Sequence, residues 1–197
     1  IGAAGTASSL AGIPFFQGDT GSIYTHDVSG TDSTAQYNTA YGLTALDAIT
    51  TGDYNVAIGY NAGSDTTSGE RNVFIGNDAG KDCIGGGQNV AIGDNAGSGA
   101  LSTAAGRNVM IGRNSGQAMT SAGENILIGF EAGKNLTIGG NNVVVGYTAF
   151  EDAVVERQCV AIGNYALANH RTSSSSVNDT GNTAVGYAAG DVITTGT

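Results

Sequence analysis

The sequence predicts an all-β protein in which the chain winds into a parallel β-solenoid, or β-roll, of about nine 17-residue coils. Three observations support this fold class. A short motif of the type Asn-Val-Ala-Ile-Gly returns along most of the chain, its spacing is nearly constant, and 33 of the 197 residues are glycine. Self-similarity at a fixed, short period is typical of folds in which each repeat stacks on its neighbours.

The motif occurs nine times from residue 38 onward. Its copies are NTAYG (38–42), NVAIG (55–59), NVFIG (72–76), NVAIG (89–93), NVMIG (108–112), NILIG (125–129), NVVVG (142–146), CVAIG (159–163) and NTAVG (182–186). Successive motif glycines are 17, 17, 17, 19, 17, 17, 17 and 23 residues apart. A small residue follows three positions after every motif glycine, which predicts close packing there.

Each period is interpreted as a short strand, a tight glycine corner, a second short strand and a turn. A helix is excluded because glycine costs about 1 kcal/mol at each interior helical position, and because the Val and Ile residues of the motif favour strands. Coils that stack at about 4.8 Å would build a rod about 43 Å long.

The repeat divides the chain into two regions. Residues 38–197 form the repeat domain, with loop insertions predicted at 98–107 and 168–181, where the spacing lengthens. Residues 1–37 combine a partial repeat with a non-repeat segment. The aromatic residues of that segment indicate a cap, a junction or a lateral elaboration.

The short strands are apolar on both faces, and this predicts two different environments. Because side chains alternate along a strand, the first and third apolar residues of each motif share one face. We expect this face to fill the coil. The predicted coil core is Val56, Ile58, Val73, Ile75, Val90, Ile92, Val109, Ile111, Ile126, Ile128, Val143, Val145, Val160 and Ile162.

The middle residue of each motif then points outward and forms a second apolar stripe. An exposed, contiguous apolar stripe marks an interaction surface, so we expect side-by-side packing of identical copies. The predicted oligomer interface is Ala57, Phe74, Ala91, Met110, Leu127, Val144, Ala161 and Ala184.

The asparagine that opens nearly every motif predicts a row of stacked amides at one corner of the rod, because stacked Asn side chains form ladders. The members of this corner ladder are Asn38, Asn55, Asn72, Asn89, Asn108, Asn125, Asn142 and Asn182. Cys159 replaces Asn in one copy and is expected to interrupt the ladder.

Charge and composition argue against several functions. The net charge is −10, and the seven basic residues are scattered, so no basic cluster is present to bind nucleic acid. No apolar run reaches the roughly 20 residues of a membrane span. The two histidines, His26 and His170, lie outside the motifs, and no spacing indicates a catalytic triad. We therefore expect a protein that is not an enzyme.

Metal and cofactor sites are not expected either. Acidic residues do not recur at a fixed repeat position, so no metal site is assigned, and calcium is the one alternative left open. Cys83 and Cys159 lie about four coils apart, or about 20 Å. A disulfide needs Cα atoms within about 7 Å, so we expect both cysteines to be small packing residues.

The repeated NVAIGYNAG (55–63), NVAIGDNAG (89–97) and NTAVGYAAG (182–190) resemble the head repeats of trimeric autotransporter adhesins. With their 17-residue period they are more similar to the repeats of phage and other viral tail-fibre proteins, since adhesin heads use a shorter repeat. The resemblance covers residues 38–197. It implies a homotrimer of parallel β-rolls with apolar residues at the three-fold axis.

The sequence thus predicts a structural fibre or filament protein, located outside the cell or on a virion, whose loops attach to a host or another surface. The alternatives are a bacterial adhesin head that binds matrix or glycans and, third, an ice- or carbohydrate-binding solenoid. A cell-surface receptor or glycan is the expected partner besides the copies of the chain. The ends, IGAAG (1–5) and DVITTGT (191–197), resemble interrupted repeats. They predict either a window of a longer fibre or subunits that stack head to tail.

Overall fold

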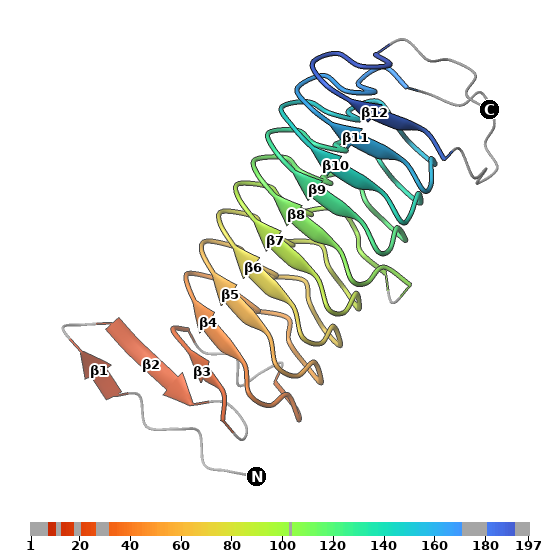
Figure 1. Cartoon of the computed structure of the whole chain (residues 1–197). Helices are drawn as coiled ribbons and strands as arrows, with labels where there is room; N and C mark the ends of the chain where they lie inside the picture. The colour runs from red at the N-terminus through yellow and green to blue at the C-terminus, as the bar shows by residue number, and fades with distance from the viewer. Residues whose placement is uncertain are drawn as a thin grey trace.

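The computed structural model describes residues 8–10, 13–17, 21–26, 32–102, 104–170 and 181–191. It is a rod of stacked coils with one short strand per coil, as Figure 1 shows. The strands are β1 Ser8–Leu10, β2 Ile13–Gln17, β3 Ile23–Tyr24, β4 Thr39–Tyr41, β5 Val56–Ile58, β6 Val73–Ile75, β7 Val90–Ile92, β8 Val109–Ile111, β9 Ile126–Ile128, β10 Val143–Val145, β11 Val160–Ile162 and β12 Thr183–Val185.

The ten strands from β3 to β12 pair in parallel, each with the strand of the next coil. The pairing register follows the repeat, so that Val56 lies beside Val73 and Ala57 beside Phe74. At the N-terminal end, β1, β2 and β3 pair in antiparallel fashion. These observations confirm the predicted all-β parallel solenoid.

The rest of each coil is built from turns, so the predicted second strand is wrong. After the strand, residues in the left-handed region alternate with ordinary ones, as at Asn61 (φ 53°) and Gly63 (φ 59°). Bonds of the turn type result, such as that from the Ser64 N–H to the Asn61 carbonyl at 3.2 Å. The intervening groups bond to neighbouring coils, as the Gly63 N–H does to the Ala79 carbonyl at 2.9 Å. Left-handed residues interrupt a strand but still allow coil-to-coil hydrogen bonds.

The motif glycines mark a place where the backbones of successive coils approach closely. Gly93 has a φ of 134°, and a Cβ added there would lie 2.7 Å from the carbonyl carbon of Gly112. The same holds at Gly59, whose added Cβ would lie 2.4 Å from the Gly76 carbonyl oxygen. Both the backbone conformation and the backbone contact therefore require glycine.

Coil stacking begins before the first motif, within the segment assigned to the cap. β3 pairs in parallel with β4, and Ser22 takes the place of the motif asparagine. The Ser22 hydroxyl accepts a hydrogen bond from the Asn38 N–H at 3.0 Å. The repeat search misses this coil because neither the asparagine nor the glycine is present. The interrupted repeats at both ends and most of the 168–181 insertion lie outside the described residues.

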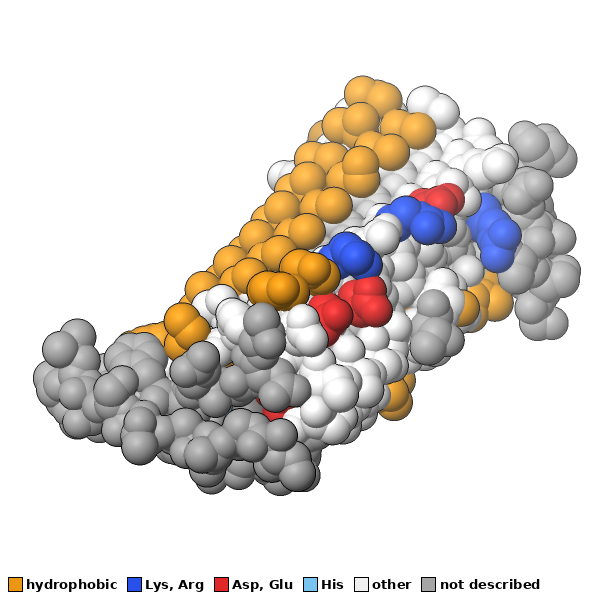
Figure 2. Space-filling model, turned by 90° about the horizontal axis from the view of Figure 1, so that it is seen from below, with side chains coloured by type: hydrophobic (Ala, Val, Ile, Leu, Met, Phe, Trp, Pro, Cys, Tyr) orange, Lys and Arg blue, Asp and Glu red, His pale blue; other side chains and the backbone are white. Residues whose placement is uncertain are grey.

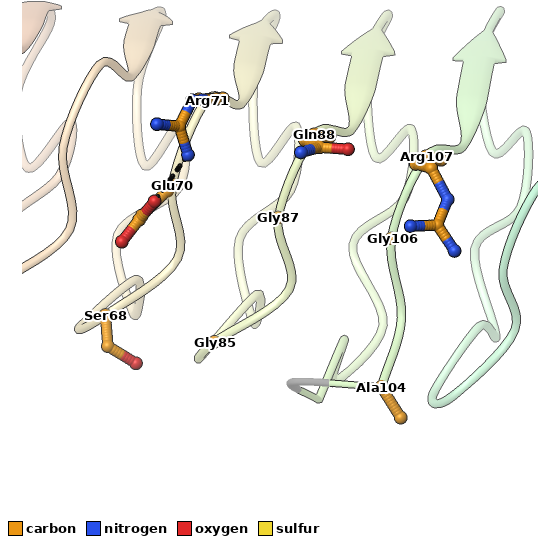
Figure 3. Close-up of a pocket in the computed structure, with 9 residues that line it drawn as sticks. All are labelled: Ser68, Glu70, Arg71, Gly85, Gly87, Gln88, Ala104, Gly106 and Arg107. Atoms are coloured by element: carbon orange, nitrogen blue, oxygen red, sulfur yellow. Dashed lines mark hydrogen bonds and ion pairs between the residues drawn. The ribbon is translucent and has the colours of Figure 1, made fainter.

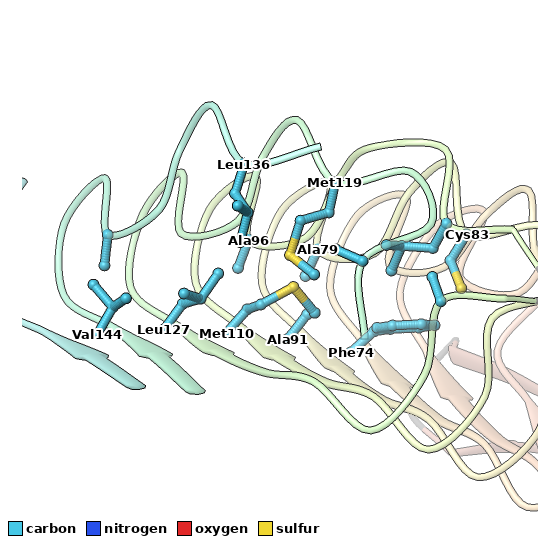
Figure 4. Close-up of a cluster of buried hydrophobic side chains, with 14 of the residues drawn as sticks. Phe74, Ala79, Cys83, Ala91, Ala96, Met110, Met119, Leu127, Leu136 and Val144 are labelled. Atoms are coloured by element: carbon cyan, nitrogen blue, oxygen red, sulfur yellow. The ribbon is translucent and has the colours of Figure 1, made fainter. Parts of the chain in front are cut away.

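The core of the rod contains the middle residue of each strand. Figure 4 shows these side chains pointing into the coil toward residues from the opposite turns, such as Met119 and Leu136. Every middle residue from Ala40 to Ala184 is at least 93% buried, and most are completely buried. The residues on either side of each middle residue face outward and are half-buried or exposed.

The sequence-based assignment of inside and outside is therefore reversed. The residues assigned to the oligomer interface lie in the core of their own coil: Ala57, Phe74, Ala91, Met110, Leu127, Val144, Ala161 and Ala184. The residues assigned to the core lie on the outer side of the sheet: Val56, Ile58, Val73, Ile75, Val90, Ile92, Val109, Ile111, Ile126, Ile128, Val143, Val145, Val160 and Ile162.

The narrow interior explains why the middle residue is the inner one. Each coil has space for one side chain from the strand and small residues opposite to it. Phe74 fits because a Cβ at Gly63 or Gly80 would lie only 2.6 or 2.3 Å from its ring. In the coils with Ala40 or Ala161 as the middle residue, Leu46 or Leu167 takes the place of that glycine and is fully buried. In the coil of Val144 the same position is Phe150, which is also fully buried, so the size of the enclosed side chains varies from coil to coil.

We predict that Gly93→Ala destabilises the rod by about 3 kcal/mol or more, because the methyl group would meet the backbone of the next coil. Gly186→Ala is the matched control. Gly186 has a similar φ of 125°, but no described atom lies within 4 Å of an added Cβ. It should cost only the conformational strain, about 1–3 kcal/mol, which Gly93→Ala incurs in addition to the backbone clash. Thermal unfolding followed by circular dichroism measures both, and equal losses would contradict the role of close coil contact.

Candidate functional site

The outer side of the sheet is a continuous apolar surface, which we call the outer face. It consists of the first and third residues of each strand from β4 to β12. Those of β5 to β11 are the outward-facing residues listed above. Ile58, Ile126 and Ile162 are 40%, 40% and 38% exposed. Figure 2 shows the orange side chains as a band along the rod, with a line of charged side chains beside it.

The outer face is large enough to be an interaction surface. Nine strands at about 4.8 Å span about 38 Å, and three residues per strand span about 10 Å. The resulting flat area, about 400 Å², is in the range of exposed apolar patches that bind partners. No described segment of the chain covers it.

Two rows of larger side chains border the outer face. The leading row consists of the residues immediately before the motif Asn (or Cys159): Tyr37, Tyr54, Arg71, Gln88, Arg107, Glu124, Asn141 and Gln158. The trailing row consists of the residues immediately after each motif glycine: Leu43, Tyr60, Asn77, Asp94, Arg113, Phe130, Tyr147, Asn164 and Tyr187. Each row stacks along the rod, one member per coil.

Contacts within the leading row change from aromatic to ionic along the rod. The rings of Tyr37 and Tyr54 stack with their centroids 4.9 Å apart, and the Arg71 guanidinium lies 5.3 Å from the Tyr54 ring. Further along, Arg107 forms an ion pair with Glu124 at 2.7 Å. Arg71, Arg107 and Glu124 carry a charge. The backbone of these three residues and of the two tyrosines is in the left-handed region. That conformation directs their side chains away from the core.

The trailing row has its bulkiest members near the other end. The rings of Phe130 and Tyr147 stack at 5.0 Å, and the Arg113 guanidinium lies 5.9 Å from the Phe130 ring. Arg113 also forms an ion pair with Asp94 at 3.3 Å. We call Arg113, Phe130 and Tyr147 the ridge.

A polar hollow lies on the far side of the leading row. Its first part, about 350 Å³, is lined by residues of three coils, including Gly85, Gly87, Gly106 and Arg107, as Figure 3 shows. A second part, about 190 Å³, continues over Gly106, Gly123 and Gly140 toward Arg157. The hollow exists because glycine occupies the position two residues before four successive motif asparagines.

The asparagine row forms a buried ladder at the corner where each strand begins. The Asn72 side chain shows the repeating pattern. Its Nδ2 donates to the Asn55 Oδ1 at 3.1 Å and to the Gly86 carbonyl at 2.8 Å. Its Oδ1 accepts from the backbone N–H and the Nδ2 of Asn89 at 2.9 and 3.2 Å. Both donors and the acceptor are thus satisfied without water, as a buried amide requires.

The ladder ends near the C-terminal end of the rod. The Cys159 N–H still donates to the Asn142 Oδ1 at 2.9 Å, but its side chain offers no amide to the next coil. Asn182, predicted to belong to the ladder, is only partly buried, and its Nδ2 lies 3.2 Å from Nε2 of the buried His170.

No group of three or more His, Cys, Asp or Glu side chains among the described residues could hold a metal ion. Cys83 and Cys159 are buried, and burial raises the pKa of the Cys83 thiol to about 12. No helix in the described part of the chain has the length and apolarity needed to cross a membrane. The candidate sites for interaction are the outer face, its two bordering rows and the hollow.

Sequence reasoning did not identify the two bordering rows or the hollow. The positions were visible in the repeat, directly before each Asn and directly after each glycine, but their residue types vary from coil to coil. Their importance depends on which strand face points outward, and that was assigned incorrectly.

Comparisons with protein-family models, with curated protein sequences and with solved structures give no match.

We predict that Asn108→Ala destabilises the protein by about 3–5 kcal/mol. It leaves the N–H and Nδ2 of Asn125 and the Ala122 carbonyl without their bonds to residue 108, and a buried unpaired group costs about 1–3 kcal/mol. Asn77→Ala is the control, since Asn77 is exposed and its side-chain amide donates to the carboxylates of Asp78 and Asp94. Denaturant unfolding measures both variants. A loss at position 108 no larger than at position 77 would refute a stabilising ladder.

We also predict that Cys83 resists thiol reagents in the native protein at pH 8, because its thiol is buried and its pKa lies far above that pH. Labelling should become fast in denaturant. Mass spectrometry of the labelled peptides gives the rates, and rapid native labelling of Cys83 would show that the coil opens easily.

Proposed function

We propose that this protein is a rigid structural rod whose copies associate side by side through the outer face to form the shaft of a fibre. The observation that carries this proposal is the uncovered apolar surface along β4 to β12. Burying about 400 Å² of apolar surface per copy corresponds to a gross gain of about 10 kcal/mol at 25 cal/mol per Å². Part of this gain offsets the entropy lost on association.

The interior of the rod supports a mechanical role. Each coil bonds to the next through the strands, the turns and the asparagine ladder. Its side chains are buried along the whole length from Ala40 to Ala184. These contacts make the described repeat region a stiff rod, because each coil is bonded to the next.

We further propose a homotrimer, located outside the cell or on a virion, in which the shaft carries an attachment region. The number three and the location come from the resemblance of the repeated NVAIGYNAG-type motifs to tail-fibre and adhesin-head repeats. In this trimer the outer face would supply the apolar residues at the three-fold axis. The sequence had assigned that role to the middle residue of each strand.

We predict that Ile126→Lys weakens self-association at least about 100-fold, because it places an unpaired charge at the centre of the buried face. Ile84→Lys is the matched control. Ile84 is 53% exposed, compared with 40% for Ile126, but lies on the turn side of the rod. Sedimentation equilibrium over a concentration series gives both association constants.

A wild-type chain that stays monomeric at all concentrations would overturn the proposed function. Equal weakening by the two substitutions would show that association uses another surface. A thermal unfolding curve for each variant establishes that the rod itself is intact.

A further inference from the structure

We propose that the copies lie parallel and in register, and that the ridge of one copy packs against the hollow beside the leading row of the next. This inference rests on the proposed function, since it specifies how the associating copies fit together. It assigns the occupant of the hollow to a second copy of this chain.

The two surfaces border the same outer face on opposite sides. Arg113 lies two residues after Ile111 at the end of β8, and Arg107 lies two residues before Val109 at its start. When parallel copies surround a common axis with their outer faces inward, the trailing row of one copy meets the leading row of the next. Antiparallel copies instead place each row against itself.

The shapes of the two sides match coil by coil. The ridge residues Arg113, Phe130 and Tyr147 follow strands β8, β9 and β10. The second, smaller part of the hollow opens beside the starts of the same strands, where Gly106, Gly123 and Gly140 lie, whereas the larger part lies beside the starts of β6 to β8. In an antiparallel pair, one hollow would face another and one ridge would face another, which leaves unfilled space and steric conflict.

The chemistry of the two sides also matches. The hollow is bordered by Arg107, Glu124 and Arg157. The ridge offers two stacked aromatic rings and a guanidinium. Guanidinium groups pack well on aromatic faces. In register, Arg113 lies level with Arg107, and the Glu124 carboxylate, one coil further along and paired with Arg107, is the partner for the cation of the ridge. Arg107 and Glu124 are 66% and 46% exposed in the single chain, so they are accessible to a neighbour.

Crosslinking between engineered cysteines tests this arrangement. Gln88 of the leading row and Asp94 of the trailing row flank β7 and lie outside the ridge. In the full chain, the double variant Gln88→Cys with Asp94→Cys should form covalent rings when treated with a short bifunctional thiol reagent. Each single variant should form none. Gln88→Cys with Tyr147→Cys is the offset control, because its sites lie three coils, about 14 Å, apart along the rod.

The ridge is tested separately by the double variant Phe130→Ala with Tyr147→Ala. We expect at least tenfold weaker association by sedimentation equilibrium, whereas Ile84→Ala, on the turn side of the rod and away from both bordering rows, should change it less than threefold.

The outcomes separate this inference from the proposed function. A monomeric wild-type chain overturns both. If the wild-type chain associates but the single cysteine variants crosslink, the copies are antiparallel and the inference is wrong. Crosslinking of the offset pair, or of no variant, also overturns it while association stands. The inference is supported if only the Gln88→Cys, Asp94→Cys variant forms covalent rings and if the Phe130→Ala, Tyr147→Ala variant associates more weakly.

Discussion

The rest of the structure depends on the close contact between each coil and the next. Backbone hydrogen bonds connect successive coils in the strand, as between the Val56 N–H and the Asn72 carbonyl at 2.9 Å, and in the turns. At the glycine corner the backbones touch, and no side chain fits between them. This contact imposes the 17-residue period, because a coil of another length would misalign these bonds. Insertions are tolerated only where the chain can leave the stack.

Close stacking also determines how polar groups are buried. The motif asparagine just before nearly every strand lies inside the rod and is inaccessible to solvent, so its polar atoms need protein partners. Asparagine supplies two donors and an acceptor in one short side chain. It therefore bonds both to the coil before it and to the coil after it, as Asn72 does. A serine replaces it only at the first coil, where Ser22 has one neighbour in the stack.

The narrow interior leaves more apolar residues than it can bury. All but the first and last motifs carry three apolar residues, and the coil encloses only the middle one. The other two form the outer face, whose apolar character contributes little to a single rod in water. It becomes favourable when copies meet, so the proposed association follows from the small cross-section of the coil. The bordering rows add shape and charge where the apolar contacts alone would permit several arrangements.

The sequence by itself determined the all-β class, the period, the position of the motif strand in each coil and the need for glycine at the corners. Each of these follows from local chemistry repeated many times. The tertiary structure alone decided which side of each strand is inside. A Val-Ala-Ile strand is apolar on both faces, so alternation does not distinguish them, and a shift of one residue exchanges the two. The deciding factor is the volume available within the coil, where Phe74 fits only because Gly63 and Gly80 lie opposite to it. That volume is a property of the closed coil, which no single motif reveals.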